Sequence, residues 1–588
     1  EYITDLSRAI WGEYEAILTN DDFSLTDKMV KLQDKLITFV NLVEPEELSM
    51  SKEKTYKPFY SMETVVLRNT MNQLRLMKRD NPGNLAIRLA HTNTRKNFHK
   101  SCHNDRLNQM AVQRLHTNRI DQIEFWRIHR RINTGSSIDQ QCPFTAGEMG
   151  EYFHELQWKG HDSKQPDYVH DYSRKYKKHQ LIADGRRFKF NKMEWDGIDK
   201  AHSVRACLKA GKRNTRDRNG INIRFLSALS EEFKEIMVFL VNASLISGKY
   251  LDEWKTCRLT PIPKKGDLSI LKSWRPITVG DCIASVVEKC AAAQFSQFLE
   301  LHNILFSSQH GFRAKVGCST AICEFTNTIR QRDAKFAIVC LLDAENAFGR
   351  PTHEQIMANL ASCCDETSLR WFEGFLGNRR FFVQTGGSKS DIYKLPPAGA
   401  GQGSGVAPIL FSFVYNNVLL AADAVSNVTA FADDLCYVSL GDTYEECELE
   451  VQRTGEYVGR VMKEKSNINI APGKSMIIRA GNGLPKKVRV NEPRGEVTIN
   501  GQVVAEPDVV TYLGIRFGPD LDLEPHLRYI KSRIYLAGHK ASRTKLYGNP
   551  KQACQLFSSI ATGVFNHGLD CQPYLSKKWY TEIQHCYN

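Results

Sequence analysis

Two short β-prone segments of this chain carry acidic residues where the apolar pattern predicts buried hydrophobic ones. Asp343 directly follows the run from Phe336 to Leu342, and Asp433 and Asp434 interrupt the segment from Val428 to Leu440. A carboxylate in a sheet interior is costly unless a cation compensates its charge. Three such carboxylates predict a divalent metal site, where two hard cations about 4 Å apart could activate a hydroxyl and stabilise a leaving pyrophosphate.

An isolated Asp-Asp pair is more often a polar hairpin turn than a metal site. Further motifs favour the metal site, because Asp343 is followed by Ala347-Phe348, then by the Gly-rich segment 401–411, then by Phe431-Ala432-Asp433-Asp434. In this order and spacing, the motifs resemble those of the reverse transcriptases of non-LTR (LINE-type) retrotransposons. The resemblance covers roughly residues 50 to 580 and is most specific between about 205 and 520.

The resemblance implies an α+β fold of the right-hand polymerase type, with fingers, palm and thumb, preceded by a mostly helical N-terminal extension. We place the basic helical extension at 1–203, the fingers at 204–335, the palm with its primer grip at 336–520, and the helical thumb at 521–588. Apolar spacing of three and four predicts helices at 5–19, 25–43, 230–247 and 443–464. Residues 258–277 predict two strands joined by a turn, and Asn500-Gly501 predicts a tight hairpin.

The composition agrees with a large protein that binds a polyanion. The chain has 588 residues, of which 42% are apolar, and a net charge of +13 with 79 Lys and Arg residues, so its surface should attract nucleic acid. Its 16 Cys residues lack zinc-ligand spacing, which predicts buried thiols in a reducing compartment. No apolar run of about twenty residues and no signal-peptide profile is present, so we expect a soluble intracellular protein.

The resemblance implies roles for several residues around the incoming nucleotide. Asp343, Asp433 and Asp434 are the expected ligands of two Mg²⁺ ions, for which Mn²⁺ could substitute. Lys474 is the expected general acid for pyrophosphate departure. The remaining residues expected to bind the deoxynucleoside triphosphate are Lys264 and Arg275 at the phosphates, Phe348 as the ring that excludes a 2′-hydroxyl, and Gln402 and Ala344 near the sugar and base.

Other motifs predict contacts with nucleic acid. The expected template and primer contacts are Gln309, Gly311, Phe312, Arg313, Tyr512, Leu513 and Gly514. A basic patch interleaved with aromatic residues predicts an RNA-binding surface, and its cations are Arg174, Lys175, Lys177, Lys178, Arg186, Arg187 and Lys189. A mobile surface loop is the alternative for this patch.

The chain departs from the family pattern at two places. Gly349 stands where an Asp commonly follows Phe348, and the segment 214–220 replaces the usual Pro-Gly-Pro-Asp-Gly run. We interpret the missing Asp as structural, so we expect activity to be retained. The altered segment 214–220 predicts a looser, more basic loop.

These features predict an RNA-directed DNA polymerase that copies the RNA of its own element from a primer 3′-hydroxyl, by target-primed reverse transcription. The expected partners are template RNA, a DNA primer or target site, and deoxynucleoside triphosphates, without a membrane. The chain begins at Glu1, and we expect it to be part of a longer polypeptide that carries the endonuclease elsewhere, is made in the cytoplasm and acts in the nucleus. A group II intron-type maturase and a domesticated, non-catalytic RNA-binding scaffold are the alternatives.

Overall fold

The computed structural model describes most of the second half of the chain and parts of the first. The described ranges are 11–43, 142–159, 193–197, 216–264, 267–330, 334–385, 387–401, 403–481 and 491–542, with scattered positions in 67–101, 182–187 and 554–581. The chain forms two compact units: the first comprises 1–48, 141–527 and 568–574, and the second comprises 49–140, 528–567 and 575–588. All predicted catalytic residues belong to the first unit.

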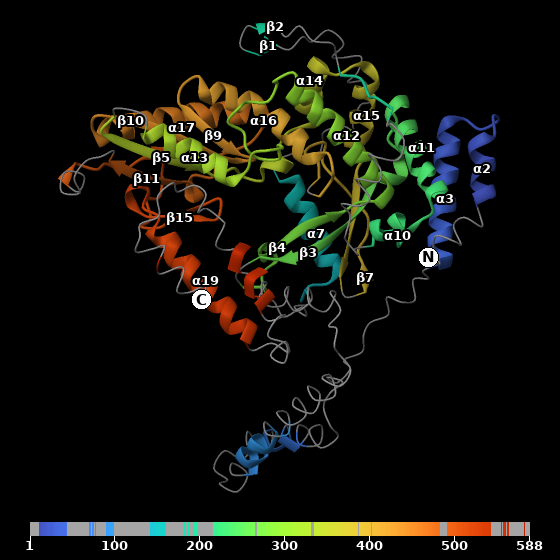
Figure 1. The fold of residues 1–588 in the computed structure, drawn as a ribbon, viewed down its shortest axis with the longest axis horizontal. Helices are drawn as coiled ribbons and strands as arrows, with labels where there is room; N and C mark the ends of the chain where they lie inside the picture. Colours follow the sequence, from blue (N-terminus) through green and yellow to red (C-terminus); the bar gives the residue numbers. More distant parts are fainter. Residues whose placement is uncertain are drawn as a thin grey trace. The chain divides into compact units, whose positions relative to one another are not determined.

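An antiparallel sheet of four strands carries the predicted carboxylates (Figure 1). Its strands, in the order β11-β5-β10-β9, are β5 (Phe336–Leu342), β9 (Asn427–Phe431), β10 (Asp434–Gly441) and β11 (Met476–Gly481). The pairing of β5 with β10 runs from Leu342 opposite Leu435 to Phe336 opposite Gly441, so both strands end together. The predictions of a strand at 336–342 and of β structure at 428–440 are therefore confirmed.

Both faces of this sheet are covered by other elements. The covering helices are α13 (Cys318–Arg330), α16 (Ala407–Asp423) and α17 (Tyr444–Ser466). Successive side chains of β5 point to opposite faces: Ile338 and Cys340 pack in a core with α16 and α17, whereas Val339 and Leu341 pack in a second core with α13. A strand buried on both faces needs a continuous apolar sequence, which explains why β5 does not alternate polar and apolar residues.

A second sheet of five strands forms the other wall of the site. Its strands are β3 (Thr256–Pro263), β4 (Trp274–Val279), β6 (Arg380–Thr385), β7 (Ser388–Lys389) and β8 (Tyr393–Lys394). The strands β3 and β4 are antiparallel with Ile262 opposite Arg275, which confirms the hairpin predicted at 258–277. Helix α7 (Ala146–Trp158) begins at a capping box between Thr145 and Glu148 and buries Met149 and Phe153 against this sheet.

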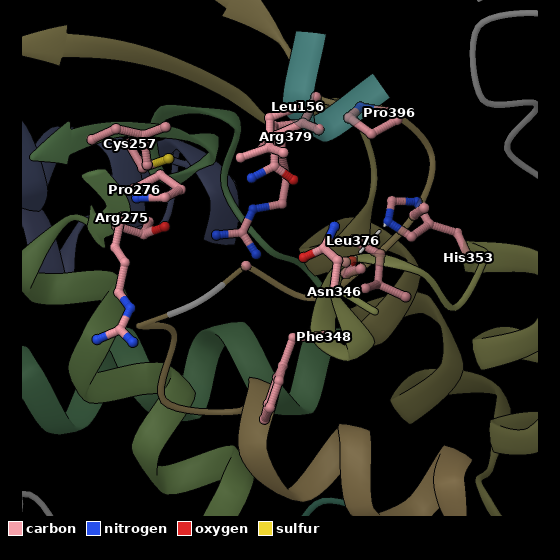
Figure 2. A pocket seen from close by; sticks show the side chains of 18 of the residues that line it. Leu156, Cys257, Arg275, Pro276, Asn346, Phe348, His353, Leu376, Arg379 and Pro396 are labelled. Carbon is pink, nitrogen blue, oxygen red and sulfur yellow. Dashed lines mark hydrogen bonds between the residues drawn. The ribbon is translucent and has the colours of Figure 1, made fainter. Parts of the chain in front are cut away.

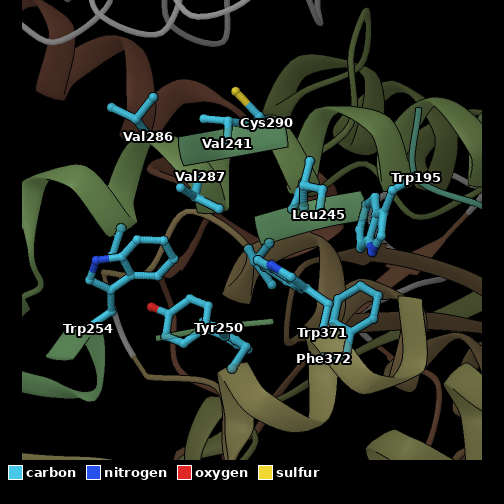
Figure 3. Close-up of a cluster of buried hydrophobic side chains, with 14 of the residues drawn as sticks. Trp195, Val241, Leu245, Tyr250, Trp254, Val286, Val287, Cys290, Trp371 and Phe372 are labelled. Atoms are coloured by element: carbon cyan, nitrogen blue, oxygen red, sulfur yellow. The ribbon is translucent and has the colours of Figure 1, made fainter. Parts of the chain in front are cut away.

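A separate group of helices forms a hydrophobic core of its own. Its helices are α2 (Trp11–Thr19), α3 (Leu25–Val43), α10 (Ile223–Ala228), α11 (Glu231–Ser247), α12 (Cys282–Leu301), α14 (His353–Cys363) and α15 (Glu366–Leu376). Figure 3 shows Tyr250, Trp254, Trp371 and Phe372 among the aromatic rings that fill it. The indole of Trp254 donates a hydrogen bond to Gln33 of α3. Helices α2 and α3, predicted as an extension, are thus part of the same hydrophobic core as α11.

Short elements complete the described structure. They are β1 (Ile182–Ala183), β2 (Arg186–Arg187), β12 (Thr498–Ile499), β13 (Gln502–Val503), β14 (Val510–Tyr512), β15 (Ile515–Phe517), α19 (Glu524–Ser542), and the 3-10 helices η2 (Asp252–Lys255), η3 (Leu271–Ser273), η4 (Ala347–Gly349), η5 (Pro472–Lys474) and η6 (Pro519–Leu521). Asn500 and Gly501 join β12 to β13 with φ of +52° and +72°, as a type I′ hairpin requires, which confirms that prediction. Across the described residues, no helix is both long and apolar enough to cross a bilayer.

Candidate active site

The hairpin of β9 and β10 ends in the acidic turn, residues 431–434. Phe431 pairs directly with Asp434, so Ala432 and Asp433 alone form the loop. Ala432 has a φ of +56°, a left-handed value that costs a residue with a Cβ about 1–2 kcal/mol. The turn therefore holds strain next to two acidic side chains, and other contacts must stabilise it.

Asp343 lies at the same end of the sheet as the acidic turn. It follows Leu342, the last residue of β5, and Leu342 pairs with Leu435, the residue after Asp434. Residues directly opposite each other on antiparallel strands are close neighbours. The register alone therefore brings Asp343 beside the turn.

The two carboxylates of the acidic turn have raised pKa values. Burial, followed by the charges of Asp433 and Asp343, raises the pKa of Asp434 to about 6. Burial also raises the pKa of Asp433, and the charge of Asp343 adds to this effect. Desolvation and neighbouring negative charge disfavour the ionised form of an acidic group, and a nearby cation favours it. This end of the sheet therefore favours positively charged ligands.

The chemistry of the three carboxylates fits a divalent cation, because Mg²⁺ prefers oxygen ligands. The Oδ2 atom of Asp343 is shielded from solvent and accepts no hydrogen bond. Within the described ranges, no three His, Cys, Asp or Glu side chains are gathered closely enough to form a complete ligand set. Instead, the Nζ atom of Lys474 lies 3.3 Å from Asp343 Oδ2.

Lys474 is held next to Asp343 by the backbone around η5. Ala471 donates its amide to the carbonyl of Asp343 at 2.8 Å, and Lys474 donates its own to the carbonyl of Ala471 at 2.9 Å. The amide of Asp343 in turn donates to Ser475 Oγ at 3.2 Å. The side chain of Lys474 is 71% exposed, so its ammonium group can reach a ligand from solvent.

A cavity of about 380 Å³ lies against Lys474. Lys264 and Arg275 of the β3–β4 hairpin also line it, and Figure 2 shows Arg275, Phe348 and Arg379 on different sides of the cavity. Burial lowers the pKa of Lys264, and the charges of Arg275 and Lys474 lower it further. A bound polyanion would offset the repulsion between these neighbouring positive charges, so the cavity is suited to a polyphosphate. The structure thus brings together three of the residues predicted to bind the nucleotide and its pyrophosphate.

Phe348 forms an aromatic wall of this cavity. Its ring stacks on Phe411 with centroids 4.4 Å apart and planes 22° apart. It also meets the ring of Phe312 edge to face, with centroids 5.9 Å apart. Such pairs hold a ring in one orientation, which a side chain that selects by steric exclusion requires.

The Gly-rich segment, taken here from Ala398 to Phe411, approaches this site more closely than residues with a Cβ could. Gly399 has a φ of +69°, and a Cβ there would lie 2.8 Å from the carbonyl of Phe348. Gly403 has a φ of +109°, and a Cβ there would lie 2.6 Å from the carbonyl of Thr278. Both positions therefore require glycine. Gln402, which lies between them, is outside the described residues.

Sequence reasoning missed two buried residues that support the Gly-rich segment. Glu288 of α12 accepts hydrogen bonds from Ser404 Oγ and the Gly405 amide, both at 2.8 Å, and from the Tyr250 hydroxyl at 2.7 Å. Arg379 is 8% exposed and donates from Nη1 to the carbonyl of Ala400 at 3.1 Å. The sequence held one signal for Glu288, an acidic residue among the apolar residues that α12 buries. A buried charge rarely lacks a partner, so this position could have been predicted to bond to another polar group.

Two of the predicted template contacts need correction. Gln309 is 1% exposed and bonds to Ala432 of the acidic turn, so its side chain does not face a template. The guanidinium of Arg313 is paired with Glu300 at 2.6 Å and donates to carbonyls of its own loop. Both side chains satisfy polar groups of the folded loop instead. Phe312, at 46% exposure, can still contact nucleic acid.

The primer-grip residues occupy the β14–β15 hairpin. Tyr512 is 5% exposed, and Leu513 and Gly514 form the turn with φ of +48° and +84°. Their contact with a primer stays a prediction. Of the basic patch, Arg186 and Arg187 are described only as backbone in β2, and Arg174, Lys175, Lys177, Lys178 and Lys189 lie outside the described residues.

Comparison with known proteins agrees with this geometry. The family model for reverse transcriptase (RNA-dependent DNA polymerase) matches residues 262–517. The probable RNA-directed DNA polymerase from transposon BS of Drosophila melanogaster is 22% identical over 310 residues, which are 51% of this chain and 33% of that protein. The RNA-directed DNA polymerase from mobile element jockey of Drosophila funebris is 23% identical over 315 residues, 52% of this chain and 33% of that protein.

A further relative belongs to a third element. The Pol polyprotein from type-1 retrotransposable element R2 of Popillia japonica is 26% identical over 216 residues, which are 34% of this chain and 30% of that protein. The matches thus cover about a third of the length of these curated relatives. A reverse transcriptase domain implies the right-hand polymerase fold, and the mixture of helices and antiparallel sheet is α+β as predicted. Residues 262–517 are therefore similar to reverse transcriptases, and the named relatives are polymerases of mobile elements.

Proposed function

We propose that this chain is an RNA-directed DNA polymerase that extends a primer 3′-hydroxyl on an RNA template. One observation carries the proposal: three carboxylates lie at one end of a buried sheet, beside a cavity lined by Lys264, Arg275 and Lys474. Carboxylates that hold metal ions and cations that hold a triphosphate are the two parts that nucleotidyl transfer requires. The similarity to polymerases of mobile elements supports the same activity.

We propose that the two sheets belong to different parts of a right-hand polymerase. We assign the four-stranded sheet with α13, α16 and α17 to the palm, because it carries Asp343, Asp433 and Asp434. We assign the five-stranded sheet and its helical core to the fingers, because its β3–β4 hairpin carries the cations of the cavity. This assignment differs from the boundaries expected from the sequence: α14, α15 and β6 to β8 would join the fingers although they lie within 336–520, and α13 would join the palm although it lies within 204–335. The thumb is proposed for residues 521–588, where α19 begins at Glu524.

In this mechanism, the carboxylates would hold two Mg²⁺ ions, which supply Lewis-acid activation of the attacking hydroxyl and of the leaving phosphate. Lys264 and Arg275 would neutralise the triphosphate and keep it in line with the primer. Lys474, whose ammonium group is exposed and adjacent to Asp343, would give a proton to the departing pyrophosphate. A metal ion held by Asp343 Oδ2 would share this oxygen with the ammonium group of Lys474, 3.3 Å away.

Phe348 would select the sugar of the incoming nucleotide. Its ring is held between Phe411 and Phe312, so it cannot turn aside without losing both contacts. A 2′-hydroxyl would collide with this ring, and that hydroxyl is what distinguishes a ribonucleotide from a deoxyribonucleotide. Ala344 follows Asp343 and is fixed by a bridge to Ile470, which would keep the floor of the sugar site in place.

At the level of the whole polypeptide, we propose target-primed copying of the element's own RNA. The named relatives are proteins of mobile elements, and one is a Pol polyprotein. The partners would be template RNA, a nicked DNA target as primer and deoxynucleoside triphosphates, with the nick made by an endonuclease elsewhere in the polypeptide. Such a reaction requires action in the nucleus, where the target DNA lies.

Primer extension on an RNA template with Mg²⁺ and deoxynucleotides tests the proposal. The intact chain should give product, and the Asp433→Ala/Asp434→Ala double variant should give none while binding the same RNA with unchanged affinity. Asp442→Ala is the matched control, because Asp442 is an exposed acid beyond β10, at the opposite end of that strand from the acidic turn. RNA binding by the intact chain without any extension would instead support a non-catalytic scaffold.

A further inference from the structure

The segment 308–311 lies directly beside β9. The amide of Ala430 donates to the carbonyl of Ser308 at 2.9 Å, and the amide of His310 donates to the carbonyl of Ala430 at 2.8 Å. This parallel bridge extends the sheet past β9. It brings Gln309, which is 123 residues away from Ala432 in sequence, to the acidic turn.

The side-chain amide of Gln309 bonds to both backbone polar groups of Ala432. Its Oε1 atom accepts a hydrogen bond from the Ala432 amide at 2.8 Å, and its Nε2 atom donates to the Ala432 carbonyl at 3.1 Å. Oε1 also accepts from the Gly311 amide at 2.8 Å. Only a neutral side chain with an acceptor and a donor on one planar group makes all three bonds.

The packing between this segment and the turn leaves no space. A Cβ at Gly311 would lie 2.2 Å from the Ala432 nitrogen, so the two backbones are in direct contact. Ala432 is the left-handed residue of the turn, and Asp433 and Asp434 follow it immediately. A strained turn next to like charges relaxes unless its backbone is fixed from outside. The amide of Gln309 fixes it at the strained residue itself.

We propose that Gln309 is a positioning residue that fixes the acidic turn, and with it the orientation of Asp433 and Asp434, for nucleotidyl transfer. The inference rests on the proposed function, because it assigns the residue a role in that reaction. Gln309 is 1% exposed and reaches the acidic turn through its two hydrogen bonds to Ala432. We call the three hydrogen bonds of the Gln309 side chain to Ala432 and Gly311 the brace. Misplacing catalytic groups by about 1 Å can lower the reaction rate roughly 100-fold, so loss of the brace should affect turnover more than binding.

The surrounding contacts allow the brace to be tested without displacing its segment. His310 is bonded to Thr320 Oγ1 at 2.8 Å and to Glu324 Oε2 at 2.6 Å, both on α13. These bonds and the bridge to Ala430 remain when the side chain of residue 309 changes. A substitution at Gln309 therefore removes the brace and leaves the segment attached.

Two variants separate the parts of the brace. Gln309→Met keeps the length and flexibility of the side chain but removes all three hydrogen bonds. Gln309→Glu keeps an acceptor for the amides of Ala432 and Gly311 but replaces the donor and adds a charge beside Asp433. The control is Asn416→Leu, because buried Asn416 likewise bonds the backbone of this loop, at Ile304 O (2.9 Å) and Phe306 N (2.6 Å), without touching the turn.

The first measurement is single-nucleotide incorporation by the full chain with Mg²⁺. In both Gln309 variants, kcat should fall by roughly 100-fold while KM for the deoxynucleotide and the affinity for primer–template stay unchanged. Asn416→Leu should retain the kcat of the intact chain. Equal losses of kcat in Asn416→Leu and Gln309→Met would reduce the effect to general destabilisation and overturn the proposal. An unchanged kcat in either Gln309 variant would overturn it as well.

The second measurement is independent of activity. The Ala432 amide donates a hydrogen bond to Gln309 Oε1, so its hydrogen exchange should become faster in Gln309→Met and stay slow in Asn416→Leu. Unchanged exchange in Gln309→Met would show that the turn needs no brace. If the intact chain does not extend primers at all, the proposed function fails, and the exchange result still decides whether Gln309 fixes the turn.

Discussion

Replacement of Lys474 by Met should separate activity from stability. Lys474 lies 3.3 Å from Asp343, but its side chain is 71% exposed and that of Asp343 is 37% exposed. Exposed ion pairs contribute roughly 0.2–1 kcal/mol, so the free energy of unfolding should change by less than about 1 kcal/mol. The loss of a cation aimed at developing negative charge typically costs about 10²–10³ in turnover.

The chain offers a matched control for this variant. Lys335 forms an ion pair of 3.4 Å with Asp442, with side-chain exposures of 59% and 68%. It precedes β5, at the opposite end of this strand from Asp343. Lys335→Met removes an equivalent charge and an equivalent exposed ion pair, so its effect on stability should be similar and its effect on turnover negligible.

Single-turnover primer extension at saturating Mg²⁺ and deoxynucleotide is the assay, with urea unfolding in parallel. The expected result is a decrease of roughly 100-fold or more in the extension rate for Lys474→Met alone, with similar unfolding midpoints for both variants. Equal extension rates in the two Lys variants would refute the role of Lys474 at the leaving group. A large loss of stability in Lys474→Met would instead make it a structural residue.

Three further outcomes are expected. Phe348→Ala should admit ribonucleotides, because it removes the ring that stacks on Phe411, and unchanged sugar selectivity in competition assays would contradict this role. Burial and the charge of Asp217 raise the pKa of Asp281 from 3.8 to about 7, so the folded state binds this proton more tightly than the unfolded state, and the free energy of unfolding should fall as the pH rises between about 4 and 7. Asp281→Asn should make the free energy of unfolding, measured by urea titration, depend less on pH over this range. An equal pH dependence in the variant and the intact chain would contradict this role of Asp281. Reversal of the charges at 174–178 should weaken RNA binding and reduce its salt dependence, whereas identical salt slopes in filter-binding assays would indicate a loop without RNA contact.

The sequence alone determined the chemistry of the site and the strands that carry it. Asp343, Asp433 and Asp434 stand out because carboxylates interrupt apolar β-prone runs, and local pattern also predicts the turn at Asn500-Gly501. These features depend on neighbouring residues: a strand buried on both faces must be apolar, and a tight hairpin needs positive φ. Local reasoning is sufficient where the physical cause is local.

The tertiary structure decided which residues support the site. Gln309 looked like a template contact in sequence, yet its amide bonds to Ala432, 123 positions away. Glu288 has no role in the sequence motifs, yet its carboxylate accepts a hydrogen bond from Gly405, 117 positions away. No pattern near either residue records these partners, because a buried polar group is satisfied by whatever the fold brings within about 3 Å of it. The sequence thus names the groups that act, and only the fold identifies the groups that hold them in place.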